Sequence, residues 1–229
     1  MSTKLPKNKA PKKTLHSLRV RMKPSERRDL ILAGAIDYFA EFGFAGKTRE
    51  LSDRLGITQP LLYRYFPSKK ALMEEVFEII FLDSWHKEWD DLLGNTDIPL
   101  NLRLLQFYQQ YFEDSFSMRW IRVYLFSGLE GTGLNQKYLK MIRQHLIDPV
   151  CYSLRAAYGK DLSWGSISDD EREFVWTLHG SFFAYATRKY IFNYETKIDF
   201  GKYLSRAINN FLDGARSNYP KLHEKQGNH

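Results

Sequence analysis

The stretch "GITQPLLYRYFPSKKAL", residues 56–72, places a glycine, two prolines and a run of aromatic and cationic side chains within seventeen positions. Gly56 favours a left-handed turn, and Thr58 is a preferred N-cap residue, so a short helix is predicted directly behind it. Pro67 ends this helix because proline cannot continue it, and Ser68 can cap the next one. The stretch therefore predicts a turn, a short helix and the start of another helix in immediate succession.

Helical signals also precede this stretch. Pro24 opens a helix whose apolar residues recur every three or four positions, and Gly43 is a natural left-handed stop for it. Thr48 can cap a second short helix at about residues 49–55. Two short helices joined by a glycine turn describe a helix-turn-helix.

A larger helical region follows. The pattern predicts a long helix over about residues 69–93, and no convincing alternating strand pattern is present anywhere. Further helices with apolar stripes are predicted at about 99–116, 118–129, 135–158 with an interruption at Pro149, 169–192 and 199–216. Ser168 and Glu171 form a capping box in front of the helix that begins at residue 169. The predicted fold class is therefore all-α, with a three-helix helix-turn-helix domain at residues 24–72 and a helical domain at residues 73–229.

Basic charge is concentrated in an N-terminal tail. Residues 1–23 hold eight cations and no acidic residue, whereas residues 24–229 hold 26 cations against 27 acidic residues. Because the tail also carries two prolines and no aromatic side chain, it is predicted to be disordered. It is either a solubilising leader or an arm that adds sequence-independent attraction to phosphates, and the sequence leaves both open.

The composition is typical of a protein in a reducing compartment. Cys151 is the single cysteine, so no disulfide within the chain is possible. No apolar run approaches the roughly 18 residues of a membrane span, and the basic N-terminus lacks the apolar core of a secretion signal. We therefore expect a cytoplasmic protein without a membrane partner.

Nothing in the pattern indicates an enzyme. The six histidines show no metal-ligand spacing with one another or with Cys151. The stretch "GLEGTG", residues 128–133, follows no predicted strand and lacks the Gly-Lys-Ser/Thr ending of a phosphate loop. We predict no catalytic residue, no metal and no cofactor.

The short helix that begins near residue 59 carries side chains suited to DNA. In a helix-turn-helix the second helix enters the major groove, and its first turn meets base edges. Gln59 can pair with adenine, Arg64 with guanine or phosphate, and Leu61 can meet a thymine methyl group. The hydroxyls of Tyr63 and Tyr65 can bind phosphate oxygens.

Two pairs of neighbouring residues support this interpretation. Leu62 and Phe66 lie four positions apart and can anchor the short helix to its domain. Lys69 and Lys70 fall in the first turn of the next helix, where the dipole disfavours cations and free N–H groups favour an anion. Their placement indicates a phosphate partner. The simpler alternative is a small surface helix with ordinary polar residues.

The motifs "FAEFG", "KTRELSDRLGIT", "LLYRYF" and "SKKAL" follow one another in the order known from one family. On these motifs, residues 26–72 resemble the DNA-binding domain of the TetR (tetracycline-repressor-like) regulators. The DNA contacts that the resemblance implies fall on Thr48, Arg49, Gln59, Pro60, Leu61, Tyr63, Tyr65 and Lys69. It also implies that the second, larger helical domain binds a small-molecule effector and forms a homodimer.

The function implied is that of a homodimeric transcriptional regulator. We expect a repressor that a small-molecule effector releases from a palindromic operator in double-stranded DNA. An effector that favours the wrong separation of the two recognition helices would weaken DNA binding. The alternative is a helical ligand-binding or protein-interaction module without DNA recognition.

Two sets of residues in the second domain are candidates for these roles. Polar residues among the many aromatic side chains could orient an effector: Gln109, Arg122 and His179. Family members usually dimerise through their last two helices, here 169–192 and 199–216. Candidate interface residues on them mix bulky and small side chains: Trp176, Gly180, Phe183, Ala184, Thr187, Ala207 and Phe211. A core face within one chain would show the same stripe, so that alternative stays open.

Overall fold

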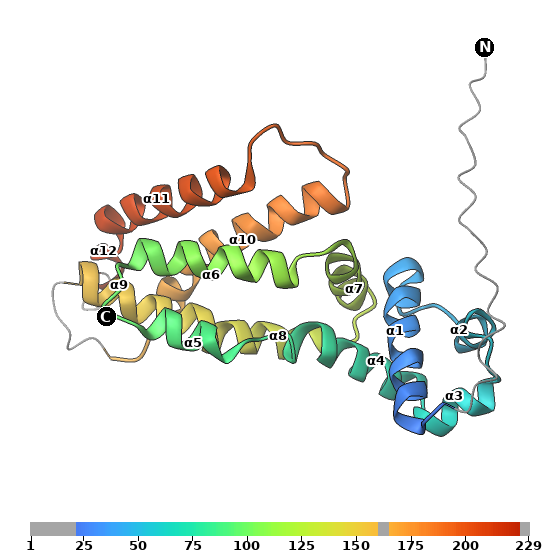
Figure 1. The fold of residues 1–229 in the computed structure, drawn as a ribbon. Coiled ribbons are helices and arrows are strands. Elements are labelled where there is room, and N and C mark those ends of the chain that lie inside the picture. The colour runs from blue at the N-terminus through green and yellow to red at the C-terminus, as the bar shows by residue number, and fades with distance from the viewer. Residues whose placement is uncertain (1–21, 160–164, 225–229) are drawn as a thin grey trace, which may run out of the picture.

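The computed structural model describes residues 22–159 and 165–224, and all regular structure in these ranges is helical. Figure 1 shows a small head of three helices at one end and a larger helical body at the other. The predicted basic tail falls outside the described residues except for its last two positions. The predicted all-α class is confirmed.

The head is formed by α1 (Pro24–Phe42), α2 (Thr48–Leu55) and α3 (Gln59–Tyr65). Gly43 and Gly56 end the first two helices with φ angles of 73° and 64°, which only glycine adopts readily. The predicted starts and stops of these helices are therefore confirmed to within one or two residues.

The prediction of one long helix over residues 69–93 is wrong, because the helix is interrupted in its middle. It forms α4 (Lys69–Phe77), a π-helical turn η1 (Glu78–Leu82) and, after a turn, α5 (Lys87–Gly94). Behind the break, Trp89 and Leu93 of α5 lie in the body core with exposures of 2% and 3%.

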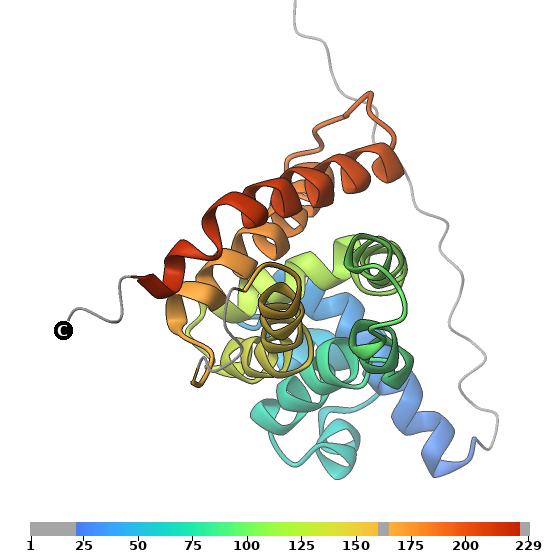
Figure 2. The same cartoon turned by 90° about the vertical axis from the view of Figure 1, so that its left-hand side faces the viewer.

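The body consists of the remaining helices around one aromatic-rich core. They are α6 (Leu100–Ser115), α7 (Met118–Leu129), α8 (Leu134–Ile142), the π-helical turn η2 (Arg143–Ile147), α9 (Asp148–Tyr158), α10 (Asp169–Tyr190), α11 (Phe200–Asn218) and α12 (Lys221–Glu224). Figure 2 shows α10 and α11 side by side as one layer, and α11 also packs against α6. The last two long helices are thus neighbours in the body.

The interruption predicted at Pro149 takes the form of the π-helical turn η2 directly before it. Proline has no N–H and its ring crowds the carbonyl one turn earlier, so a wider turn there relieves the clash without breaking the helix. As a result α8, η2 and α9 run on without a loop between them.

Head and body meet where α7 packs across α1. The Arg122 guanidinium in α7 donates hydrogen bonds to the main-chain oxygens of Ala40 and Glu41 at the end of α1. Arg119, one turn earlier, forms an exposed ion pair with Asp37. The end of α1 is therefore held by the body as well as by the head.

A buried ion pair closes the end of the body away from the head. Arg155 of α9 donates from Nε and Nη2 to the two carboxylate oxygens of Glu171, at 2.7 and 2.8 Å, and Glu171 is fully buried. The Tyr219 hydroxyl lies 2.8 Å from the same carboxylate. Burial alone would raise the pKa of Glu171, but hydrogen bonds from Arg155 and Ser168 outweigh it and lower the pKa to about 2.

Candidate nucleic-acid interface

The candidate interface is built on α3, which two apolar side chains anchor to the head. Leu62 and Phe66 are each only 1% exposed, as their spacing predicted. The Thr58 side chain caps the helix by accepting a hydrogen bond from the Leu61 main-chain N–H. Because one face is held this way, the opposite face of α3 is presented to solvent.

A hydrogen-bonded cluster joins α3 to the start of α2. The Gln59 side-chain amide donates to the Thr48 hydroxyl over 3.0 Å, and the Tyr63 hydroxyl lies 3.0 Å from the same oxygen. Thr48 is only 8% exposed, so it is the hub of this cluster rather than an open surface group. Its position fixes the side chains of Gln59 and Tyr63 before any partner arrives.

The remaining predicted contacts differ in exposure. Arg49, Pro60, Arg64 and Lys70 are exposed, and Tyr63 is 37% exposed despite its hydrogen bond. Leu61, Tyr65 and Lys69 are half-buried. Five of the ten predicted contact residues are thus exposed, and the other five are half-buried or buried.

The start of α4 adds a second point of positive charge. The Ser68 hydroxyl caps it by accepting from the Ala71 N–H at 3.0 Å, as predicted. Lys69 and Lys70 follow in its first turn without an acidic neighbour there, although Lys70 approaches Glu74 one turn later at 3.9 Å. Free N–H groups and two lysines together make this helix end attractive to a phosphate.

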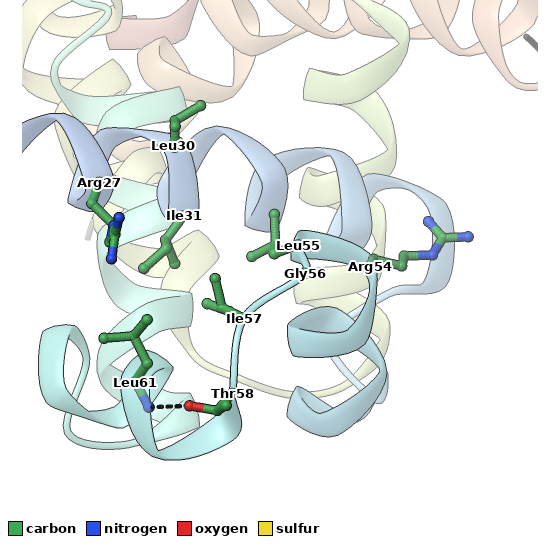
Figure 3. Close-up of a pocket in the computed structure, with 9 residues that line it drawn as sticks. All are labelled: Arg27, Leu30, Ile31, Arg54, Leu55, Gly56, Ile57, Thr58 and Leu61. Carbon is green, nitrogen blue, oxygen red and sulfur yellow. Dashed lines mark hydrogen bonds between the residues drawn. The ribbon is translucent and has the colours of Figure 1, made fainter. Parts of the chain in front are cut away.

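A groove that was not predicted from the sequence lies on the head, between α1 and the turn from α2 to α3. Its volume is about 370 Å³, and apolar side chains of both helices line it together with Arg27 and Arg54 (Figure 3). Leu61 turns into this groove beneath Ile57, so only part of its side chain can reach a partner of α3. Leu30, 46% exposed at its rim, is the one residue whose exposed apolar character could have indicated the groove.

The three candidate effector contacts lie in different surroundings. Gln109 is exposed on α6, and Arg122 is engaged with the end of α1. His179 is buried in α10 with Nδ1 3.5 Å from the Tyr108 hydroxyl, and burial lowers its pKa to about 4. That these three residues contact an effector stays a prediction.

The candidate dimer residues lie along α10 and α11. Gly180 and Ala184 are exposed, and the side chains of Trp176, Phe183, Thr187 and Ala207 are half-buried. Phe211 is only 8% exposed and packs on Phe174 within the chain, with ring centroids 5.1 Å apart. Phe183 and Trp176 also contact rings of their own chain, Tyr124 and His179. The face therefore has an open, small-residue centre, and its aromatic members already have partners within the chain.

Among the described residues, no group of three His, Cys, Asp or Glu side chains is placed to hold a metal ion. Within the same ranges, no helix is both long and apolar enough to span a membrane.

Comparison with known proteins agrees with the geometry of the head. Residues 31–76 match the family described as "Bacterial regulatory proteins, tetR family". Over 78 residues the chain is 36% identical to the HTH-type transcriptional repressor KstR2 of Mycolicibacterium smegmatis, covering 34% of this chain and 38% of that protein. Over 62 residues it is 39% identical to the HTH-type transcriptional regulator RutR of Escherichia coli, covering 27% and 29%. The match thus spans well under half the length of either relative.

Solved structures resemble the whole fold. A TetR-like regulator from Rhodococcus superposes with a TM-score of 0.60 at 19% identity, over 85% of this chain and all of that one. A tetR-family regulator from Streptomyces coelicolor gives 0.58 at 19% identity, over 90% and 87%. A helix-turn-helix head on an all-helical body defines a class of regulatory proteins. Residues 31–76 of this chain thus match the TetR family of bacterial regulatory proteins, and its fold resembles that of TetR-like regulators.

Proposed function

We propose that this protein is a repressor that binds a palindromic operator as a homodimer and is released by a small-molecule effector. In this proposal residues 24–72 bind DNA and residues 73–229 bind the effector and the second subunit. One observation carries it: α3 is fixed from below by Leu62 and Phe66, and it presents a face of tyrosine, arginine and amide groups beside the lysines of α4.

Electrostatics supports DNA as the partner of this face. Arg49, Arg64 and Lys70 are exposed around the start of α2, along α3 and at the start of α4. Cations in such positions neutralise phosphates and release counterions, which makes affinity fall steeply with salt. The preformed Thr48 cluster lowers the cost of ordering Gln59 and Tyr63 on binding.

The test is a titration of the protein against the DNA upstream of its own gene, followed by fluorescence anisotropy at several salt concentrations. Arg64→Ala and Lys70→Ala should each reduce the salt slope by about one unit if each side chain contacts a phosphate. Lys140→Ala is the control, because Lys140 is an exposed cation on α8 of the body. Binding without salt dependence, or equal losses in all three variants, would refute DNA docking through this face.

A further inference from the structure

A second groove lies at the end of the body away from the head, between the α5–α6 connection and α9. Figure 1 shows α5 and α9 at this end, opposite α1–α3. The groove has a volume of about 540 Å³, within the range of small-molecule sites. Apolar residues form much of its wall: Leu93, Ile98, Pro99, Leu100, Ala156 and Ala157.

One buried cation lines this groove. Arg103 of α6 is only 5% exposed, and arginine is rarely so buried without an acidic partner. Its Nη1 donates to the main-chain oxygen of Leu93 and, over 3.2 Å, to the Ser153 hydroxyl. Both acceptors are neutral, so within the described residues no carboxylate balances this charge.

The guanidinium also has donors to spare. Within the described ranges, Arg103 Nε is buried without a hydrogen-bond partner, and Nη2 makes no hydrogen bond either. A buried donor without a partner destabilises the folded chain, and it does so more strongly when the group is charged. The contrast with Arg155 is direct, since that guanidinium is equally buried and meets the Glu171 carboxylate with two hydrogen bonds.

A simpler function for Arg103 is to cap the end of α5 through Leu93. The partial negative charge of a helix end offsets only about half of a unit charge, and it engages Nη1 alone. The Nε–Nη2 edge is the side of a guanidinium that pairs with a carboxylate through two parallel hydrogen bonds. Capping therefore accounts for the contacts of Nη1, whereas the Nε–Nη2 edge, which suits an anion, has no hydrogen-bond acceptor among the described residues.

We propose that this groove binds a small amphipathic carboxylate, whose headgroup pairs with Arg103 and whose apolar part covers the wall formed by Leu93, Ile98 and Leu100. The unbalanced charge selects an anion, and the apolar wall selects one with a hydrocarbon portion over inorganic ions. Tyr152, 59% exposed on α9, lies at the groove and adds an aromatic surface for that portion. Binding here does not depend on the proposed function; only its consequence for DNA affinity does.

The experiment titrates octanoate and octanol into the full chain by calorimetry and follows thermal unfolding in parallel. Octanoate should bind and raise the unfolding temperature, whereas octanol, which has the same chain length without the charge, should bind at least about tenfold more weakly. Sulfate should not compete with octanoate. Equal binding of the acid and the alcohol, or full competition by sulfate, would overturn the proposal.

Variants locate the site. Ala156→Trp should abolish octanoate binding by filling the groove, since Ala156 is exposed on α9 and lines it. Gln136→Trp is the matched control, because Gln136 is exposed on α8 outside the groove, and it should leave binding unchanged. Arg103→Met should weaken octanoate at least about tenfold and octanol little. If Arg103→Met fails to fold, Ala156→Trp still decides: octanoate binding that survives it refutes this site.

A DNA titration separates this proposal from the proposed function. Loss of DNA affinity on adding octanoate, absent in Ala156→Trp, would make the groove the effector site. If the protein without octanoate fails to bind DNA, the repressor proposal fails while the calorimetry still decides the groove.

Discussion

Arg122 in α7 donates a hydrogen bond from Nη2 to the main-chain oxygen of Glu41 in α1, over 2.9 Å, and a second one from Nε to Ala40. These carbonyls belong to the last turn of α1, where no N–H within the helix reaches them. A cation is also the preferred charge at a helix C-terminus. Since α1 belongs to the head and α7 to the body, these hydrogen bonds add to the packing of α7 across α1 and help to hold the head in one orientation on the body.

Arg122→Ala should therefore loosen the head from the body. We expect the free energy of unfolding to fall by about 1.5–3 kcal/mol, the value of hydrogen bonds to a charged group. If the proposed dimer binds DNA, its affinity should fall about fivefold or more, because the two heads would no longer be held at one separation. Arg119→Ala is the control and should cost less than about 1 kcal/mol, because its ion pair with Asp37 is exposed. Equal effects of the two substitutions would show that the hydrogen bonds from Arg122 to α1 contribute no more than the exposed ion pair of Arg119.

Gly43→Ala tests the same junction from the other side. Gly43 has φ 73° and ψ −179°, a region essentially restricted to glycine. An added Cβ would also lie 2.9 Å from the Phe126 ring of α7 and 2.7 Å from the carboxylate of Glu130, which directly follows α7. We expect a loss of at least about 1–3 kcal/mol in chemical denaturation. Gly128→Ala, where the nearest atom lies 3.7 Å away, should be neutral or stabilising by up to about 1 kcal/mol.

Glu171→Gln should destabilise the body strongly. It removes the charge of the carboxylate that pairs with the buried Arg155 guanidinium, and breaking a buried ion pair costs about 3–5 kcal/mol. Asp169→Asn removes a carboxylate two residues away that is 97% exposed, so it should change stability by less than about 1 kcal/mol. Urea unfolding of both variants measures the difference. Similar midpoints would mean that the buried pair contributes no more than a surface one.

The lowered pKa of His179 predicts that the folded chain loses stability in mild acid. Its pKa is lowered by burial to about 4 in the folded chain, against an ordinary value of 6.5, so only the unfolded chain takes up a proton between these values. The stabilising contribution is complete above pH 6.5 and is lost as the pH falls toward 4. Between pH 7 and pH 5 the loss should be about 2 kcal/mol, a window above the range in which Glu171 titrates. In His179→Gln the stability measured by denaturation should change less over this window, and an unchanged slope would refute the assignment.

Gly180→Arg tests the predicted dimer face. Gly180 is exposed in α10, and a Cβ added there meets no atom of its own chain within 4 Å. The substitution should therefore leave the single chain folded while blocking a second copy from approaching α10. Light scattering should show a monomer for Gly180→Arg and a dimer for the native chain and for Gln136→Arg. A dimer that survives Gly180→Arg would place the interface elsewhere.

Much of the fold could be predicted because its helix starts are encoded locally. Thr58, Ser68, Ser117 and Ser168 each cap a helix through a hydrogen bond to a nearby N–H, and each cap is visible in the sequence. The break between α4 and α5 was missed because no proline or glycine marks it. Trp89 and Leu93, which follow the break, pack against helices that are distant in the sequence, and a local pattern does not reveal such contacts.

The candidate site was predictable as a set of residues but not as an arrangement. Spacing correctly identified Leu62 and Phe66 as anchors. It could not show that Thr48 is buried beneath Gln59 and Tyr63, because that contact joins residues 11 and 15 positions apart. The Arg103 groove was equally invisible, since an arginine in an amphipathic helix gives no sign that its counter-charge is absent.

The buried hydroxyl of Tyr219 has a consequence for the order in which the chain acquires its structure during synthesis. It donates to the Cys151 main-chain oxygen over 3.1 Å, and its partners Cys151 and Glu171 precede it by 68 and 48 residues. The helices of the head, by contrast, lie next to one another along the chain and can form as soon as they leave the ribosome. The body can complete its packing only after α11 and Tyr219 have been synthesised. A chain cut short before Tyr219 would therefore display a finished head on an open body, a target for proteases rather than a smaller regulator.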